Sequence, residues 1–412
     1  MPSRMPLLRL GRPIWLERNA RARATYPSLS GHREVDVAIV GGGITGGAIA
    51  EAFAGAGVRV AVVDAALVGR GSTAASSALL LREPDMGLGD LSRRYGSKKA
   101  RRIWQLSAQA VGEFVTTVRR LDIDCDLVDE DSVYYTLDAE AVEPLRAELR
   151  RRVKAGFSEE WLTPGALRRL TGISGRAAIL TRGNAQFNPY KACIGLVRAA
   201  AHSGAHIFER SRATRIESGR DGVRIVTPRG TIGAAQVIIA TGYATPQFKP
   251  LAGRFRLHRT FVLATKPVSR RQRSELGLGR MMLWDTERPY HYARWTADNR
   301  LLLGGEDLPV VPGRGPGAAF KKGTRALRDY FESLLPALAD VGIDTAWDGL
   351  FAMTPDGLPY IGPHARYPRH LFALGYGGNG MTFGFLAAQL LLERWRGVDS
   401  ADHELFAFNR YR

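Results

Sequence analysis

The hydrophobic pattern near the start of the chain is that of a buried strand, a turn, a helix and a second strand. Residues 35–40, Val-Asp-Val-Ala-Ile-Val, are largely apolar and β-branched, as in a parallel strand covered on both faces. A glycine-rich turn at 41–47 leads into the alanine-rich segment 48–56, and a second apolar run at 58–63 ends at Asp64. This order predicts a βαβ unit within a parallel sheet.

The middle of the chain has a different pattern. Amphipathic stretches at 100–121 and 141–155 indicate helices, and the region between 90 and 180 shows little that is typical of a parallel sheet. Alternating apolar and polar positions at 255–268 and 290–304 indicate an antiparallel sheet. A further helix is predicted at 189–202, with strand-sized runs at 206–208, 223–227 and 235–240.

The last quarter of the chain repeats the opening order, with a strand at 370–374, a glycine-rich turn at 375–380 and a helix at 381–395. We therefore predict a mixed α/β fold, with a Rossmann-like domain around a parallel sheet and a second domain with helices and a largely antiparallel sheet. The expected first domain comprises residues 35–88, 190–254 and 345–412, the second comprises 89–189 and 255–344, and residues 1–34 form an N-terminal extension.

Length and composition agree with two domains. A chain of 412 residues that is 45% hydrophobic can supply two cores. Cys125 and Cys193 are the only cysteines and form no CxxC pair or Cys/His cluster, which argues against a disulfide scaffold and against structural zinc. No run reaches the roughly 20 apolar residues of a membrane span, and Arg9, Arg12 and Pro13 interrupt the apolar core of a signal peptide. We expect a cytoplasmic protein without a metal ion.

The basic charge is open to two interpretations. The chain has 58 Lys and Arg against 40 Asp and Glu, a net charge of +18. One interpretation is an electrostatic funnel for an anionic substrate, an acidic partner or a nucleic acid. The other is an arginine-rich bias spread over solvated faces. We favour the second because the basic residues are scattered and are not interleaved with aromatic ones, so a nucleic acid is not the partner that we expect.

The first glycine-rich turn carries a dinucleotide-binding pattern. Gly41, Gly43 and Gly46 form a G-x-G-x-x-G motif directly after a strand, and Asp64 ends the next strand. Gly41 would permit a tight turn, Gly43 would leave room for a pyrophosphate, and Gly46 would allow the helix to pack on the strand. Asp64 can accept hydrogen bonds from a ribose diol, and its charge disfavours a 2′-phosphate. The motif predicts nucleotide binding without distinguishing FAD from NAD.

Further segments resemble one family. They read GRGSTAASS at 69–77, IIATG at 238–242, TPDGLPYIG at 354–362 and GYGGNGMT at 375–382. In this order they are similar to the D-amino-acid oxidase superfamily of FAD-dependent oxidoreductases, the group that includes glycine oxidase and sarcosine oxidase. The resemblance extends from residue 35 to about residue 400. The string at 354–362 looks mainly architectural, because its proline and glycine positions specify a fixed turn.

The resemblance implies that FAD is the cofactor. The serine-rich turn would contact the pyrophosphate and the ring, and the helix from Met381 would direct its positive N-terminus at the flavin. The expected cofactor-binding residues are Gly41, Gly43, Ile44, Thr45, Gly46, Asp64, Ser72, Thr73, Ala75, Ser76, Thr214, Thr241, Gly242, Gly375, Gly378, Asn379, Gly380, Met381 and Thr382.

The chain departs from the family pattern at positions that carry chemistry. Phe351 stands where glycine oxidase-like members have the arginine that binds the substrate carboxylate, and Gly349 stands where sarcosine oxidase-like members have the cysteine that is linked to flavin. The resemblance therefore implies non-covalent FAD. By a short ungapped match, Leu302 falls near the lysine that assists the reaction with dioxygen in sarcosine oxidase.

The strand-like segment 290–295 supplies the candidate catalytic residues. Tyr290, Tyr292 and Arg294 alternate and would share one strand face, which in the family forms a roof over the flavin. Arg294 is the candidate for holding a carboxylate, unless the substrate is an amine that has none. A packed or solvated strand is an equally weighted interpretation. His291 would face the other way as a structural residue, and Gln186 could reach the pocket.

We expect an FAD-dependent oxidoreductase that oxidises a C–N bond of an amine or amino acid to an imine, with hydride transfer to flavin N5. The electron acceptor is dioxygen or another compound. The alternatives are an NAD(P)H-dependent flavin hydroxylase, a flavoprotein subunit of a dehydrogenase, and, on charge alone, a tRNA-modifying or other nucleic-acid-binding flavoprotein.

Overall fold

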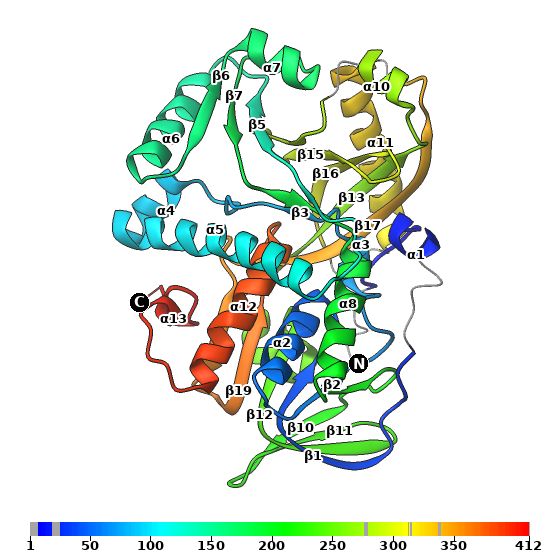
Figure 1. The fold of residues 1–412 in the computed structure, drawn as a ribbon, viewed down its shortest axis with the longest axis vertical. Helices are drawn as coiled ribbons and strands as arrows, with labels where there is room; N and C mark the ends of the chain where they lie inside the picture. The colour runs from blue at the N-terminus through cyan, green and yellow to red at the C-terminus, as the bar shows by residue number, and fades with distance from the viewer. Residues whose placement is uncertain are drawn as a thin grey trace.

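The structure of the protein, a computed structural model, describes residues 7–18, 25–275, 279–311, 313, 315–336 and 339–411. Two lobes lie one above the other in Figure 1, and each contains an eight-stranded sheet. The helices are α1 (Ile14–Arg18), α2 (Ile44–Gly55), α3 (Ser72–Ala75), α4 (Leu88–Tyr95), α5 (Ser97–Arg120), α6 (Val142–Lys154), α7 (Pro164–Thr171), α8 (Pro189–His202), α9 (Lys249–Ala252), α10 (Arg270–Glu275), α11 (Pro316–Leu334), α12 (Gly380–Trp395) and α13 (Asp402–Leu405).

The lower lobe in Figure 1 contains a parallel core of strands in the order β9 (His206–Phe208), β2 (Val60–Val63), β1 (Gly31–Val40), β12 (Gly230–Gly242) and β19 (Tyr367–Leu374). β12 is long enough for its two halves to pair with different strands. Its first half pairs with antiparallel β11 (Val223–Val226), which also pairs with β10 (Arg215–Ser218), and its second half pairs with β19. β18 (Tyr360–His364) adds to β19. The sheet confirms the predicted βαβ unit and the return of the chain to it.

Three helices cover one face of this sheet. α2, α8 and α12 pack on one another and share a hydrophobic cluster with side chains of β1 and β2. Both ends of α8 are as predicted. Pro189 lies in its first turn, where a missing N–H costs nothing, and the Asn188 side chain caps it by accepting a hydrogen bond from Lys191 N. These helices keep the parallel strands buried.

The upper lobe is a mixed sheet that is mostly antiparallel. Its order is β17 (Ile343–Met353), β13 (Arg256–Thr265), β16 (Leu301–Pro309), β15 (His291–Trp295), β14 (Met282–Asp285), β5 (Ser132–Thr136), β7 (Ala177–Thr181) and β6 (Glu159–Leu162). Among the strands of the described residues in this sheet, only β14 and β5 pair in parallel. β3 (Leu79–Leu80), β8 (Ala185–Gln186) and β4 (Val128–Asp129) form a small third sheet. The antiparallel sheet was predicted from 255–268 and 290–304.

The structure differs from the predicted boundaries in several places. Residues 31–34, expected in the extension, are the start of β1, and residues 345–353, expected in the first domain, belong to β17 in the upper sheet. Helix α5, expected in the second domain, packs on α12 and buries its apolar face in the lower lobe's cluster. The region between 90 and 180 also supplies strands of the upper sheet. The hydrophobic pattern along a helix shows that it has an apolar face. It does not show which of the two lobes' hydrophobic cores that face packs into.

The N-terminal segment runs beside β17. Leu350 N donates to Leu8 O at 2.9 Å, Asp348 N donates to Leu10 O at 3.1 Å, and Arg12 N donates to Ala346 O at 3.2 Å. Residues 8–12 of the extension are therefore attached to the upper sheet, whereas residues 31–34 belong to β1 of the lower one. Across the described residues, helices long enough to cross a bilayer are not apolar enough to do so.

Candidate functional site

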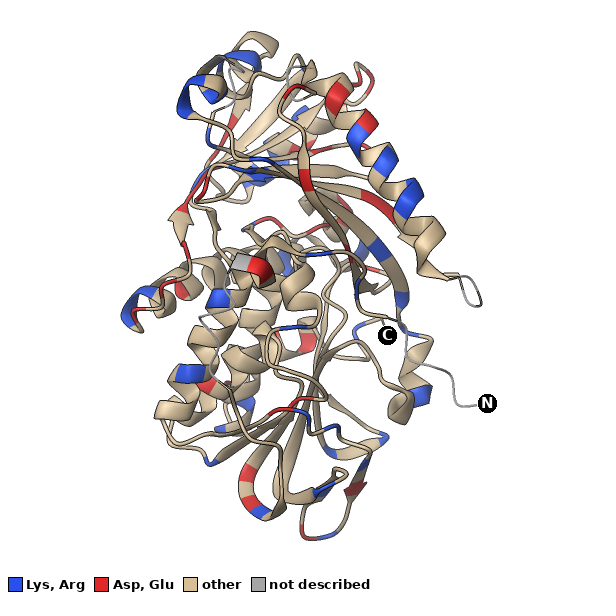
Figure 2. Ribbon diagram, turned by 90° about the vertical axis from the view of Figure 1, so that its right-hand side faces the viewer, with Lys and Arg blue, Asp and Glu red and all other residues tan. Residues whose placement is uncertain are grey.

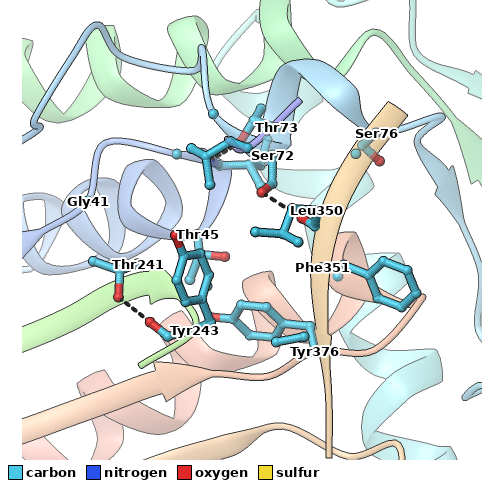
Figure 3. A pocket seen from close by; sticks show the side chains of 18 of the residues that line it. Gly41, Thr45, Ser72, Thr73, Ser76, Thr241, Tyr243, Leu350, Phe351 and Tyr376 are labelled. Carbon is cyan, nitrogen blue, oxygen red and sulfur yellow. Dashed lines mark hydrogen bonds between the residues drawn. The ribbon is translucent and has the colours of Figure 1, made fainter. Parts of the chain in front are cut away.

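A cavity of about 910 Å³ lies between the lobes, at the carboxyl ends of the parallel strands. Ligands of open α/β sheets bind at this edge, and the volume is at the upper end of the range for small-molecule sites. The ends of β1, β2 and β12 form its floor, and residues of β13, β15 and β17 cover it. Figure 3 shows part of this lining, with Gly41 of the glycine turn at the left, Ser72 and Thr73 at the top, and Ser76 beside Leu350 and Phe351 of β17 at the right.

Each glycine of the motif in the first turn is needed for a different steric reason. Gly41 has a φ of +115°, and a Cβ there would lie 2.6 Å from Ala240 O. A Cβ on Gly46 would lie 1.8 Å from Gly41 O, so Gly46 is required by helix packing and does not line the cavity. A Cβ on Gly43 would meet only Thr73 Oγ1 within 4 Å, at 3.1 Å. Gly43, Ile44 and Thr45 line the cavity at the start of α2, where helix amides favour phosphate.

Asp64 is held at the end of β2 by backbone amides. Its carboxylate accepts hydrogen bonds from Gly42 N at 2.8 Å and from Ala66 N at 2.7 Å. Burial raises the pKa of Asp64 above its usual value, and these two N–H groups oppose that shift. A carboxylate has lone pairs beyond those two, so Asp64, which lines the cavity, can also accept the hydroxyls of a ribose.

The serine-rich turn lies against the cavity with most of its hydroxyls engaged. Ser72 Oγ donates to Leu350 O at 3.1 Å, and Thr73 Oγ1 accepts from Ile44 N at 2.9 Å. Ser76 Oγ accepts from Ala78 N at 3.0 Å. Ser72, Thr73, Ala75 and Ser76 all line the cavity, as do Thr214, Thr241 and Gly242 near β12. These hydrogen bonds restrain the turn.

The late glycine turn contributes only part of the predicted set. Gly378, Asn379, Gly380 and Met381 line the cavity. Gly375 and Thr382 do not. A Cβ on Gly375 would lie 2.6 Å from the Phe255 ring, and Thr382 Oγ1 is buried and donates to Leu81 O at 2.8 Å.

An aromatic chamber occupies the upper part of the cavity. Tyr290, Tyr292, Phe351, Trp284 and Thr260 line it. Tyr292 OH lies 3.2 Å from Thr260 Oγ1, and the Tyr290 and Tyr292 rings are 5.9 Å apart. Burial raises the pKa of Tyr292 to about 12, so both phenols stay protonated and can donate at neutral pH.

Arg294 is not part of this chamber, which corrects the prediction. Its Nε donates to Ser77 O and its Nη2 donates to Phe187 O at 2.8 Å, so the guanidinium faces a separate, smaller cavity. Two residues along a strand advance about 6.8 Å, and this step carries Arg294 past the end of the chamber. Gln186 also lines the smaller cavity and lies 3.4 Å from Arg294 Nη1. His291 is structural as expected, between Asp285 and Glu306.

Several cavity residues were missed by sequence reasoning. Asp85 accepts a hydrogen bond from Gly378 N at 2.5 Å, and Arg288 lies at the exposed edge of the cavity. Leu7 and Leu8 reach it from the N-terminal segment. Asp85 and Arg288 lie in irregular loops, and their types and positions follow no periodic pattern that could have singled them out. Leu302, which was matched to a dioxygen-activating lysine, is buried in the core and does not line the cavity.

The parts of the cavity fit the parts of FAD. The open position at Gly43 suits a pyrophosphate, Asp64 suits a ribose diol, and the cavity continues past the serine-rich turn to the aromatic chamber, where a flat ring can lie. The N-terminus of α12 meets the cavity at Gly380 and Met381, where its dipole favours negative charge.

Comparison with known proteins supports the same assignment. Residues 36–394 match the family described as FAD dependent oxidoreductase (DAO). Gamma-glutamylputrescine oxidoreductase of Escherichia coli (strain K12) is 28% identical over 395 residues, which cover 94% of this chain and 90% of that protein. Glycine oxidase of Bacillus licheniformis is 25% identical over 384 residues, which cover 92% and 98%. A crystal structure of glycine oxidase from Geobacillus kaustophilus has a TM-score of 0.76 at 23% identity, covering 90% of this chain and 96% of that one.

The family match spans both lobes and both glycine-rich turns, and the solved structure has the same fold. The cavity retains a place for each part of the cofactor. The chain therefore belongs to the DAO family of FAD-dependent oxidoreductases.

Proposed function

We propose that the protein oxidises the C–N bond of an amine to an imine, which water then hydrolyses to a carbonyl compound. The observation that carries this proposal is the pairing of an aromatic chamber with the Asp85 carboxylate in the same cavity. A cationic amine is attracted both by a carboxylate and by the faces of aromatic rings. The proteins similar to this chain include one named for an amine, gamma-glutamylputrescine, and one named for an amino acid, glycine.

Asp85 is placed to meet an amine. No ion pair to Asp85 is found among the described residues, and its oxygens lie near the Tyr290 hydroxyl. A Cβ built on Gly378 would be 2.4 Å from Tyr290 OH and 3.1 Å from Asp85 Oδ1, so the three groups converge. Burial raises the pKa of Asp85 to about 6, although two backbone amides and Arg288 favour its ionised form. Asp85 is therefore ionised at neutral pH and can hold a cation.

The residues of the chamber then have distinct roles. Asp85 binds the ammonium and takes a proton from it, which frees the nitrogen lone pair. Tyr290 and Tyr292 orient the C–H bond, and Phe351 keeps water away from it. FAD, when bound, supplies the acceptor for the hydride that leaves this carbon. Loss of one proton to Asp85 and of the hydride from carbon converts the ammonium into a protonated imine, which water hydrolyses to the carbonyl compound and ammonium, so atoms and charge balance.

The cofactor residues belong to the same proposal. We place the ADP half of FAD on Gly41, Gly43, Ile44, Thr45 and Asp64. The flavin lies between the serine-rich turn and the Gly378–Met381 turn. We propose that FAD is not covalently linked, because Gly349 is at the family's cysteine position and neither Cys125 nor Cys193 is among the residues that line the cavity. Both cysteines are buried free thiols, which suits a reducing cytoplasm.

Arg288 favours a second candidate, the oxidation of an α-amino acid. Phe351 lines the cavity where the family resemblance would place a carboxylate-binding arginine, and Arg288 is a cation on the same cavity. A substrate carboxylate could pair with the Arg288 guanidinium while the amine meets Asp85. The two candidates differ in whether the substrate needs a carboxylate.

The test is anaerobic mixing of the FAD-loaded protein with matched amines and amino acids that differ only in the carboxylate. We expect loss of the oxidised flavin absorbance with the amines. Bleaching that requires the carboxylate would support the amino-acid candidate, and bleaching by no amine or amino acid would overturn both. Bleaching by NADPH alone would instead support a flavin hydroxylase.

Two further measurements address the remaining open points. Air admitted after bleaching separates dioxygen from another electron acceptor, because an oxidase regains its flavin absorbance within turnover time. Retention on RNA that falls steeply with salt would support the nucleic-acid alternative, and no retention at low salt would exclude it.

A further inference from the structure

Consecutive backbone carbonyls of the serine-rich turn are each held by a different buried side chain. Trp347 Nε1 donates to Ala75 O at 2.9 Å, and Trp15 Nε1 donates to Ser76 O at 2.8 Å. Arg294 Nε donates to Ser77 O. The residues that carry these carbonyls line the cofactor cavity. Because the C=O and N–H of a trans peptide point in opposite directions, fixing each carbonyl also fixes the next N–H.

The donors come from distant parts of the chain. Trp347 lies on β17, Arg294 on β15 and Trp15 on α1 in the N-terminal segment, and their exposed fractions are 0%, 2% and 5%. The Arg294 guanidinium lies 5.2 Å from the centre of the Trp15 ring. This guanidinium donates hydrogen bonds to neutral oxygens: Ser77 O, Phe187 O, Trp295 O and the Gln186 amide oxygen. The indole face therefore stabilises a buried cation that also interacts electrostatically with Asp126.

The segment that carries Trp15 is attached on its other side to β17. Asp348 accepts from Leu10 N and forms a buried ion pair with Arg259, whose Nη1 is 2.8 Å from Asp348 Oδ2. Arg259 also donates to Leu7 O. Leu7 and Leu8 then line the cavity beside the serine-rich turn. A backbone segment held at this many points cannot leave without exposing the turn.

We propose that residues 7–16 are a clasp of the cofactor site, with Trp15 as the positioning residue that holds the Ser76 carbonyl. This segment precedes residues 36–394, the part that the family shares. The clasp pre-organises the serine-rich turn, so FAD binds without first ordering it. The clasp acts on FAD binding, which does not depend on the identity of the amine.

Trp15→Phe tests the clasp because it keeps an aromatic ring beside Arg294 while it removes the indole N–H, together with part of the ring. The measurement is titration of apoprotein with FAD, followed by flavin fluorescence. We expect the FAD dissociation constant to rise about fivefold, as for the loss of one hydrogen bond. Trp161→Phe is the matched control, since Trp161 lies on the far edge strand β6 and does not line the cavity.

Two outcomes would overturn the proposal. One is a dissociation constant in Trp15→Phe within twofold of the parent. The other is a protein lacking residues 1–16 that folds, as judged by its thermal transition, and binds FAD as tightly as the full chain. A shortened protein that does not fold leaves the Trp15→Phe result to decide. Failure of the amine proposal would leave these titrations unchanged.

Discussion

At the scale of single residues, the site depends on side chains whose surroundings change their chemistry. Asp85 is near Tyr290, Arg288 and Asp307, and burial raises its pKa to about 6. An aspartate in water would be fully ionised well below that pH. Arg294 shows the opposite case, because burial lowers the pKa of its guanidinium to about 9 and it still remains charged at neutral pH.

Asp85 gives a prediction for the pH dependence of the reaction. The ionised form binds the ammonium, and it forms as pH rises through about 6. We therefore expect kcat/KM for a cationic amine to rise across that range, until the amine itself loses its proton. Asp85→Asn should lower kcat/KM about tenfold or more and remove the rise. Steady-state rates between pH 5 and 8, with FAD content measured alongside, test this. An unchanged pH profile in the variant would contradict the assignment.

Phe351 gives a second prediction, about specificity. It lines the cavity at the position where the family resemblance implies an arginine in glycine oxidase-like members. Phe351→Arg should favour substrates with an α-carboxylate, because a guanidinium can bind a carboxylate through two hydrogen bonds. We expect the ratio of kcat/KM for an amino acid to that for the matched amine to increase about tenfold. Phe351→Leu is the control, and an equal increase there would show that size rather than charge is responsible.

At the scale of elements, a buried ion pair fastens the turn at 354–358 to the C-terminal segment of the chain. Asp356 accepts hydrogen bonds from Thr354 Oγ1 at 2.9 Å and from Leu358 N at 3.2 Å. Arg410 donates to it from Nε at 2.8 Å and from Nη2 at 2.9 Å. Both side chains of the pair are buried, at 2% and 0% exposed. This network holds the turn in place, as the architectural interpretation of the string at 354–362 expects.

Asp356→Asn should be strongly destabilising, because it leaves the buried Arg410 without a charged partner. We expect a loss of about 3–5 kcal/mol in the free energy of unfolding, measured with denaturant at pH 7. Asp36→Asn breaks an ion pair with the exposed Arg59 and should cost at most about 1 kcal/mol. Equal losses in the two variants would contradict the prediction.

The same pair gives a pH window. Burial favours the protonated acid, but the hydrogen bonds and charge of Arg410 outweigh it and lower the pKa of Asp356 to about 2. A carboxyl with a lowered folded-state pKa stabilises the protein above its unfolded value near 4, and this contribution is lost as pH falls towards 2. The difference between the parent and Asp356→Asn should therefore shrink between pH 4 and pH 2.

At the scale of the whole molecule, both lobes and the N-terminal segment contribute to one cavity. Residues from β1, β2 and β12 in the lower lobe face residues from β13, β15 and β17 in the upper lobe. The basic residues show no comparable convergence, since Figure 2 shows Lys and Arg spread over both lobes among Asp and Glu. The basic residues that give the net charge of +18 are thus not gathered on one element in that view.

A cavity shared by two lobes predicts that FAD stabilises the molecule as a whole. A ligand that binds only the folded state adds about 2.7 kcal/mol when its concentration is 100 times its dissociation constant. We expect the Tm of the apoprotein to rise with the logarithm of FAD concentration, in a single transition. Calorimetry of the apoprotein at increasing FAD checks this. A second transition that does not respond to FAD would show that one lobe melts independently.

The sequence by itself determined the elements whose pattern is local: the βαβ unit, α8 with both its ends, and the glycine turn with Gly41, Gly43 and Asp64. Hydrophobic period, caps and turn residues act within a few positions, so they can be read along the chain. Tertiary structure alone decided that Asp85 and Arg288 line the cavity. It also decided that Arg294 lies beyond the cavity and donates to Ser77 O, and that Trp15 donates to Ser76 O. Those contacts join strands and loops that are distant in sequence, and their positions follow only from how the two sheets pack.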